Sequence, residues 1–129
     1  MKAVLWFILS VTSSSVFASD WQGRLSDGIK SANPKVIELR HDFHAYPELG
    51  NREFKTAEKI ANHLRSLGIE VQTGVAKTGV VGILKGNNPG KVIALRADID
   101  GLPVTERNDL AFKSEVKTTF LGAETGVMH

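Results

Sequence analysis

Lys91-Val-Ile-Ala-Leu-Arg-Ala-Asp-Ile-Asp-Gly-Leu-Pro-Val-Thr-Glu106 is an apolar run that ends at two carboxylates and then turns. Val92 to Leu95 are four consecutive apolar residues, two of them β-branched, which predicts a strand buried on both faces of a parallel or mixed sheet. A glycine and a proline follow and end this strand. We therefore expect Asp98 and Asp100 at its carboxyl end, where open α/β sheets bind ligands.

The two aspartates allow two interpretations. By the two-residue period of a strand, Arg96, Asp98 and Asp100 share one face. Two neighbouring carboxylates repel unless a cation lies beside them, which favours a divalent metal. In the alternative, Asp98 pairs with Arg96 and Asp100 caps the turn. The D-x-D spacing alone does not choose between them, because it is common in ordinary turns.

The first 18 residues have the pattern of a secretory signal peptide. Met1-Lys2 gives a positive start, residues 3–11 are almost wholly apolar, and Val16 and Ala18 fit the small-residue positions of a cleavage site. The apolar core is shorter than the roughly 20 residues that a membrane-spanning helix needs. We expect cleavage after Ala18 and a secreted or periplasmic product of residues 19–129. An uncleaved anchor or a buried first helix is the alternative.

Composition excludes several classes of partner and site. The 129 residues include 16 basic and 14 acidic residues and no cysteine. Loss of Lys2 with the signal peptide leaves a net charge near +1 and no block of like charge, so we expect neither nucleic acid nor a membrane surface as partner. Without disulfides, the exported domain depends on a core, a metal or a partner, and roughly 110 residues are enough for one small core.

Apolar periodicity predicts three helices followed by three strands. The helices are expected over residues 21–32, from Pro34 to the residue before Pro47, and over 57–67, and the strands over 69–72, 79–84 and 92–95. The turn Gly86-Asn-Asn-Pro-Gly90 is expected to join the last two strands as a hairpin. Residues 108–121 fit a short helix or an irregular segment equally well, and residues 122–126 are typical of a loop. This order predicts an α/β fold, an incomplete α/β/α sandwich.

Two histidines lie three residues apart in the second predicted helix. His41 and His44 share a face and could in geometry reach one metal. A metal needs three or four ligands, and the only carboxylates of that helix are Glu38 and Asp42. Histidines near the negative pole of a helix end are therefore the favoured interpretation. His63 borders an apolar stripe and is interpreted as a partly solvated flank residue.

Several ordered blocks along the chain carry a resemblance. They are Arg40-His-Asp-Phe-His-Ala-Tyr-Pro-Glu-Leu-Gly50, Glu53, Thr56-Ala57, Thr78-Gly-Val-Val81, Leu95-Arg-Ala-Asp-Ile-Asp-Gly-Leu-Pro103 and Glu106. Together they closely resemble the metal-dependent amidohydrolase and zinc peptidase family of aminoacylase, hippurate hydrolase and the hydrolases of indole-acetyl amino acid conjugates. The resemblance covers about residues 34–129 and implies the catalytic domain of a two-metal exopeptidase-like fold.

In that family the Arg-Ala-Asp-x-Asp block ends a central strand beside a two-metal site. The resemblance implies that Asp100 supports the metal ligands without binding the ions itself, and that Asp98 stands where carboxypeptidase relatives carry a histidine ligand. Two zinc or manganese ions would polarise an amide carbonyl and lower the pKa of a bridging water, which attacks the scissile carbon. The glutamate that acts as general base in the family has no counterpart in this chain.

The family's next block reads Met-His-Ala-Cys-Gly-His-Asp, whereas this sequence ends with Val127-Met128-His129. His129 matches the first histidine of that block, which is not the usual ligand. The metal ligands, the catalytic glutamate pair and the lid or dimerisation domain are therefore expected beyond His129. We expect residues 19–129 to be the amino-terminal part of the catalytic domain and to be inactive alone.

The resemblance implies an exported enzyme that cleaves N-acyl amino acids or similar conjugates, and a homodimer at full length. Two alternatives stay open. A dipeptidase or carboxypeptidase of the same fold would act on peptides through the same two-metal chemistry. A truncated, non-catalytic binding module would fold alone and bind without turnover.

Overall fold

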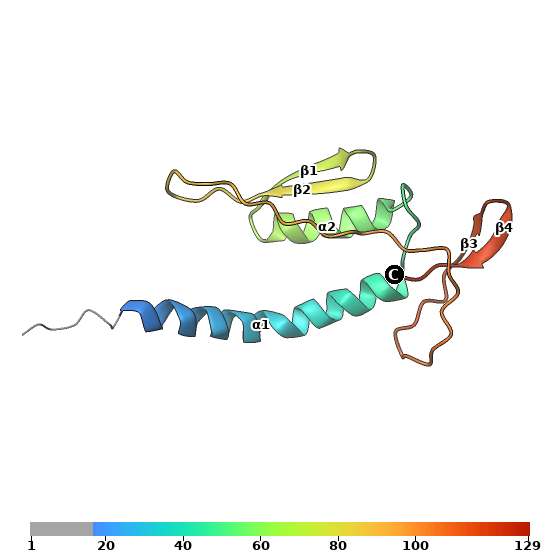
Figure 1. Cartoon of the computed structure of the whole chain (residues 1–129), viewed down its shortest axis with the longest axis horizontal. Coiled ribbons are helices and arrows are strands. Elements are labelled where there is room, and N and C mark those ends of the chain that lie inside the picture. Colours follow the sequence, from blue (N-terminus) through green and yellow to red (C-terminus); the bar gives the residue numbers. More distant parts are fainter. Residues whose placement is uncertain (1–16) are drawn as a thin grey trace, which may run out of the picture. The chain divides into compact units, whose positions relative to one another are not determined.

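The computed structural model describes residues 17–129, which form two helices and four strands. Along the chain they are α1 (Phe17–Ala45), α2 (Phe54–Ser66), β1 (Glu70–Val75), β2 (Gly79–Ile83), β3 (Lys117–Phe120) and β4 (Ala123–Gly126) (Figure 1). Helices combined with antiparallel strands confirm the predicted α/β class. The predicted signal peptide falls almost wholly on residues 1–16, which lie outside the described residues, and it stays a prediction. Within residues 17–129, neither helix is long and apolar enough to cross a bilayer.

The described residues divide between Ile37 and Glu38 into two compact units. The described part of the first unit is helical, and its apolar stripe is exposed, with Trp21, Leu25 and Ile29 more than half accessible. The prediction of two helices separated at Pro34 is wrong, because α1 continues through this proline. A proline removes one backbone hydrogen bond from a helix. Good helix formers lie near the proline and let the helix continue: Lys30 and Ala32 before it, and Lys35 and Leu39 after it.

The second unit contains α2, whose prediction is confirmed. This helix packs on β1 and β2 (Figure 1). Its residue Ala61 is buried. It ends where Gly68 takes a φ of +75°, a left-handed conformation that favours glycine, and donates its N–H to the carbonyl of Arg65. Gly82 of β2 lies so close to the helix that a side-chain carbon there would be 3.2 Å from Leu64.

Strands β1 and β2 form an antiparallel hairpin in which Glu70 lies opposite Ile83. Both strands were expected near these positions, but the predicted hairpin between residues 79–84 and 92–95 is wrong. β2 pairs with the strand that precedes it, because the short turn at Ala76 and Lys77 folds the chain directly back. Both turn residues have positive φ, which matches the twist of a tight hairpin.

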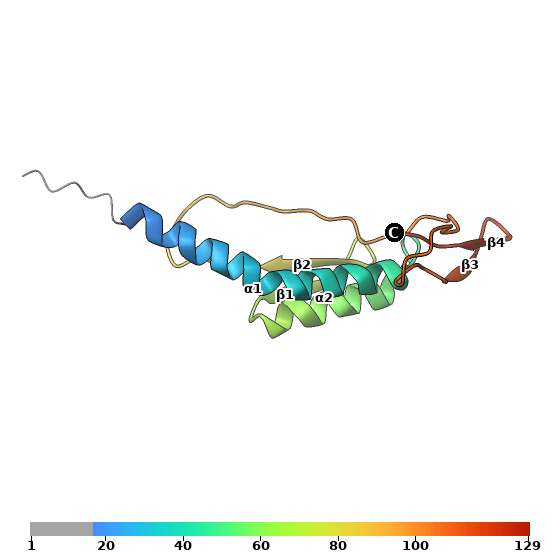
Figure 2. The ribbon, with the colours of Figure 1, turned by 90° about the horizontal axis from the view of Figure 1, so that it is seen from below.

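The strand predicted over residues 92–95 is not present in this structure, and that prediction is corrected. Residues 84–100 form no helix or strand (Figure 2), and Val92, Ile93 and Leu95 are 96%, 85% and 97% exposed. A strand forms only where a neighbouring strand accepts its hydrogen bonds and other layers cover its faces. Among residues 17–129 no segment pairs with this run, so the apolar sequence has no strand partner.

The last described elements, β3 and β4, form a second antiparallel hairpin. Leu121 and Gly122 make its two-residue turn with φ of 50° and 83°. The expected loop over residues 122–126 is therefore wrong, because most of it is strand β4. Residues 108–121 were expected to form either a short helix or an irregular segment. The segment before β3 is irregular, so the four-residue spacing of its apolar side chains does not indicate a helix.

Three short segments meet around Gly101 and form a small core in the second unit. Leu49 makes a parallel bridge with Gly101, and Leu102 makes an antiparallel bridge with Met128. Leu49 and Val127 are 5% and 2% exposed. A side-chain carbon on Gly101 would lie only 2.8 Å from Cγ1 of Val127, so the close approach requires glycine. We call residues 47–49, 100–102 and 127–129 the three-segment cluster.

Candidate functional site

Asp98 and Asp100, the two predicted site residues, lie in the irregular segment that leads into the three-segment cluster. Nη2 of Arg96 donates to Oδ1 of Asp98 at 2.5 Å, and both side chains are mainly exposed. This contact is the ion pair of the turn interpretation. Asp100 is half-buried, and its carboxylate accepts no hydrogen bond from residues 17–129, so the expected turn cap is not formed there. Their roles beside a metal site stay predictions.

The backbone of Asp100 is held on both sides. Gly101 donates its N–H to the carbonyl of Glu48 at 2.7 Å, and Leu102 donates to the carbonyl of Met128 at 2.7 Å. Nδ1 of His129 lies 2.7 Å from the carbonyl oxygen of Asp100. Because a carbonyl can only accept, Nδ1 carries the proton in this contact, which leaves Nε2 as the acceptor of a neutral ring.

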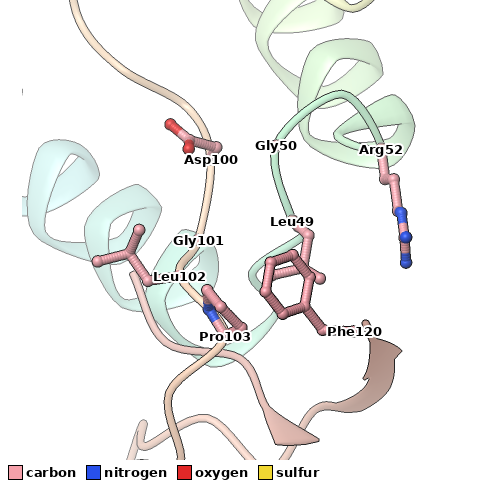
Figure 3. A pocket seen from close by; sticks show the side chains of 8 residues that line it. All are labelled: Leu49, Gly50, Arg52, Asp100, Gly101, Leu102, Pro103 and Phe120. Atoms are coloured by element: carbon pink, nitrogen blue, oxygen red, sulfur yellow. The ribbon is translucent and has the colours of Figure 1, made fainter. Parts of the chain in front are cut away.

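Asp100 lines two cavities of the second unit. The smaller, of about 220 Å³, is lined by Leu49, Gly50, Arg52, Asp100, Gly101, Leu102, Pro103 and Phe120 (Figure 3). In Figure 3 the carboxylate of Asp100 points to the left, away from Arg52, and the side chains of Leu49, Pro103 and Phe120 lie lower in the view. The larger cavity, of about 610 Å³, is bounded by the loop after Leu49, the β1–β2 turn and residues 96–100. Asp100 therefore contributes to the walls of both cavities.

Three glutamates connect the sequence blocks that carry the resemblance, and sequence reasoning had assigned none of them a contact. The first is Glu48, whose Oε2 accepts hydrogen bonds from the N–H of Thr56 at 2.8 Å and from its hydroxyl at 2.9 Å. Thr56 lies in the first turn of α2, where backbone N–H groups have no partner within the helix. Glu53 at the N-cap position makes no side-chain cap bond, so Glu48 caps α2 from outside it.

Glu53 is the second of these glutamates, and it ties α2 to the β1–β2 turn. Its side chain is buried, and its Oε2 accepts a hydrogen bond from the hydroxyl of Thr78 at 2.7 Å. Burial alone raises the pKa of this carboxyl, but the hydrogen bonds from Thr78 and from nearby backbone groups outweigh it and hold the pKa below its ordinary value. Glu53 is therefore charged at neutral pH.

The third glutamate, Glu106, fixes the irregular segment that follows the three-segment cluster. Its side chain is 1% exposed, and Oε1 lies 2.8 Å from Nε2 of His44. The N–H of Ser114 donates to Oε2 at 2.6 Å, and the amide of Asn108 donates to Oε1 at 2.5 Å. The hydrogen bond from His44, with smaller help from Ser114 and Asn108, holds the pKa of Glu106 below its ordinary value.

The two helical histidines share a face, as expected, but Phe112 occupies that face. The ring of His41 stacks on Phe112 with centroids 3.7 Å apart, and the ring of His44 meets it edge-on at 5.6 Å. Within the described chain, no three histidine, aspartate or glutamate side chains converge so that they could hold a metal ion. The residues of 17–129 therefore do not fit the two ions that the resemblance implies.

The comparisons with curated proteins agree with the resemblance. No protein-family model matches the chain. Thermostable carboxypeptidase 1 of Saccharolobus solfataricus is 45% identical over 107 residues, which is 82% of this chain and 25% of the relative. The hippurate hydrolase of Campylobacter jejuni is 47% identical over 89 residues, 64% of this chain and 23% of the relative. The N-acetylcysteine deacetylase of Bacillus subtilis is 42% identical over 91 residues, 70% of this chain and 24% of the relative.

One solved structure shows the same fold over most of the chain. It is the Bacillus subtilis YXEP protein, described as a dinuclear metal binding peptidase from the M20 family, with 40% sequence identity and a TM-score of 0.66. The match covers 78% of this chain and 26% of that protein. The chain thus spans about a quarter of the length of the relatives it matches. These matches confirm the predicted resemblance: the chain is a homologue of the amidohydrolases and peptidases of the M20 family over about a quarter of their length.

Proposed function

We propose that this chain is part of an exported, metal-dependent amidohydrolase that cleaves the amide bond of N-acyl amino acids or similar conjugates. The observation that carries the proposal is the set of glutamate contacts. Glu48, Glu53 and Glu106 connect the family-like blocks to one another, and Gly50, Glu53 and residues 78–81 of these blocks line one cavity together with Asp100. Hippurate hydrolase and N-acetylcysteine deacetylase, both above 40% identical, are named for N-acyl amino acid substrates.

The exposed apolar run supports the view that more protein completes this fold. Val92, Ile93 and Leu95 are almost fully exposed, although fully burying each such side chain is worth about 1.5–3 kcal/mol. In the proposal, further parts of the enzyme cover these side chains and supply the site for two divalent metals, zinc or manganese. Export rests on the predicted signal peptide alone, and the homodimer rests on the resemblance alone. The proposed substrate is a small molecule, with no role for nucleic acid.

A peptidase is the second candidate, because thermostable carboxypeptidases 1 and 2 of Saccharolobus solfataricus are 45% and 46% identical over 82% of the chain. Both candidate substrates contain an amide bond and both reactions are hydrolyses. They differ in the group on the acyl side of that bond, a simple acyl group in one and an amino acid residue in the other. A comparison of activity toward hippurate and toward a dipeptide therefore distinguishes them.

A chimeric enzyme tests the proposal. Residues 38–129 of this chain replace the corresponding stretch of the Campylobacter jejuni hippurate hydrolase. We expect metal-dependent hydrolysis of hippurate, and a loss of about 10- to 100-fold in kcat/KM for Asp100→Asn, the range found when supporting residues of metal sites are changed. Glu70→Gln is the control, because within residues 17–129 the side chain of Glu70 makes only an exposed ion pair with Lys85. A folded, metal-loaded chimera without activity on hippurate would contradict the amidohydrolase proposal.

A further inference from the structure

We propose that Glu48 is a positioning residue that fixes the backbone at Asp100 by coupling it to the start of α2. The coupling joins two contacts of one residue, a side-chain contact to Thr56 and a main-chain contact to Gly101. Its relevance to catalysis rests on the proposed function, in which Asp100 serves the reaction. The coupling itself can be measured without any activity.

Asp100 depends on its backbone for its orientation. Its carboxylate receives no hydrogen bond from the described residues, so nothing in residues 17–129 holds the side chain directly. The main chain is held instead by three hydrogen bonds. The N–H of Gly101 donates to the carbonyl of Glu48, the N–H of Leu102 donates to the carbonyl of Met128, and the His129 ring donates to the carbonyl of Asp100. Any shift of the Glu48 carbonyl therefore moves the peptide group that carries Asp100.

The position of Glu48 is set by its carboxylate. Oε2 binds both the N–H and the hydroxyl of Thr56, and Thr56 is 6% exposed. A carboxylate at the first turn of a helix satisfies a free N–H and interacts favourably with the positive end of the helix dipole. Glu53 at the N-cap position binds Thr78 instead, so Glu48 performs the capping that Glu53 does not.

Tight packing transmits this position to Gly101. Pro47 and Leu49, on either side of Glu48, are both buried. A side-chain carbon on Gly101 would lie 2.9 Å from Cβ of Pro47, so the Pro47 side chain packs closely against Gly101. Because Pro47 packs closely on Gly101 and the Gly101 N–H donates to the Glu48 carbonyl, a displacement of residues 47–49 displaces Gly101 as well.

Amide hydrogen exchange on the full chain tests the coupling. In Glu48→Ala we expect the protection of the Gly101 amide to fall about tenfold, the equivalent of one lost cap, while Val81 in the β1–β2 hairpin keeps its protection. Glu48→Gln keeps an oxygen that can accept from Thr56, and should restore Gly101 to within about threefold of the parent. The control Ala61→Gly loosens α2 without touching Glu48.

The outcomes separate a positioning role from general destabilisation. If Glu48→Ala lost protection equally at Gly101 and Val81, as expected for Ala61→Gly, the proposal would be overturned. It would also be overturned if Gly101 kept its full protection in Glu48→Ala, or if the Gly101 amide were unprotected in the parent. In the hippurate hydrolase chimera, Glu48→Ala should lower kcat with little change in KM, and Glu48→Gln should recover kcat. If the exchange result holds but the parent chimera is inactive, the proposed function fails and the coupling stands.

Discussion

Gly101→Ala probes how far the three-segment cluster holds the second unit together. The new methyl group would lie 2.8 Å from Cγ1 of Val127 and 2.9 Å from Cβ of Pro47. Both neighbours are buried, so neither can swing into solvent. Overpacking a close-packed site costs about 1–3 kcal/mol, and two such short contacts place this change in the upper half of that range.

A second contribution has the opposite sign. Gly101 does not have a positive φ, so alanine can adopt its backbone conformation. Replacing glycine at such a position stabilises a protein by about 0.4–1 kcal/mol, because the unfolded chain loses conformational freedom. The net expectation is a loss of about 2 kcal/mol in the free energy of unfolding. With a urea slope of about 1–2 kcal/mol/M, the midpoint should fall by about 1–2 M.

The measurement is urea unfolding of the full chain, followed by far-ultraviolet circular dichroism. Gly86→Ala is the matched control, because among the described residues nothing beyond the chain neighbours of Gly86 lies within 4 Å of the added carbon, and Gly86 also lacks a positive φ. The double variant Gly101→Ala/Val127→Ala should recover part of the loss, because it removes the shortest contact. A Gly101→Ala midpoint equal to that of Gly86→Ala would refute the packing argument.

Three further predictions concern other parts of the chain. Leu121→Asn should raise the thermal midpoint by the equivalent of about 0.5–1 kcal/mol, because asparagine tolerates the φ of 50° better than leucine, and Leu121→Val should lower it. The pKa of Glu53 is lowered in the folded protein, so the stabilisation from its charged form is present above pH 4.5 and is lost as the pH falls through the folded pKa. Glu53→Gln should therefore lower the thermal midpoint at pH 7. Between pH 7 and about pH 3 the midpoint of this variant should fall less steeply than that of the parent. Mass spectrometry of exported protein should find an amino terminus at Ser19, and a retained residue 1–18 segment would contradict the signal peptide.

Local sequence signals predicted the elements that depend on local interactions. α2 was predicted because its apolar residues follow the helical period and Gly68 ends it, and both features act within a few residues. The β1 and β2 strands were found near their predicted positions for the same reason. Pro34 was misread as a helix start, because a single lost hydrogen bond does not outweigh the propensity of the residues around it.

The remaining features depend on residues far apart in the sequence. Residues 92–95 have a strand sequence, but strand formation requires a pairing partner that residues 17–129 do not provide. The contacts Glu48–Thr56, Glu53–Thr78 and His44–Glu106 could not be read from periodicity, because both members of each pair are polar and belong to no regular pattern. All six residues belong to the blocks that resemble the family, which marks them as candidates for a structural or functional role. That resemblance does not indicate which of them contact each other.

The bridges of the three-segment cluster also determine the order in which the second unit can fold. α2, β1 and β2 follow one another directly, so their contacts close short loops and form early. The bridge between Leu49 and Gly101 closes a far longer loop, and Leu102 cannot pair with Met128 until residue 128 has been made. During synthesis, the bridges around Asp100 therefore form after the contacts among α2, β1 and β2.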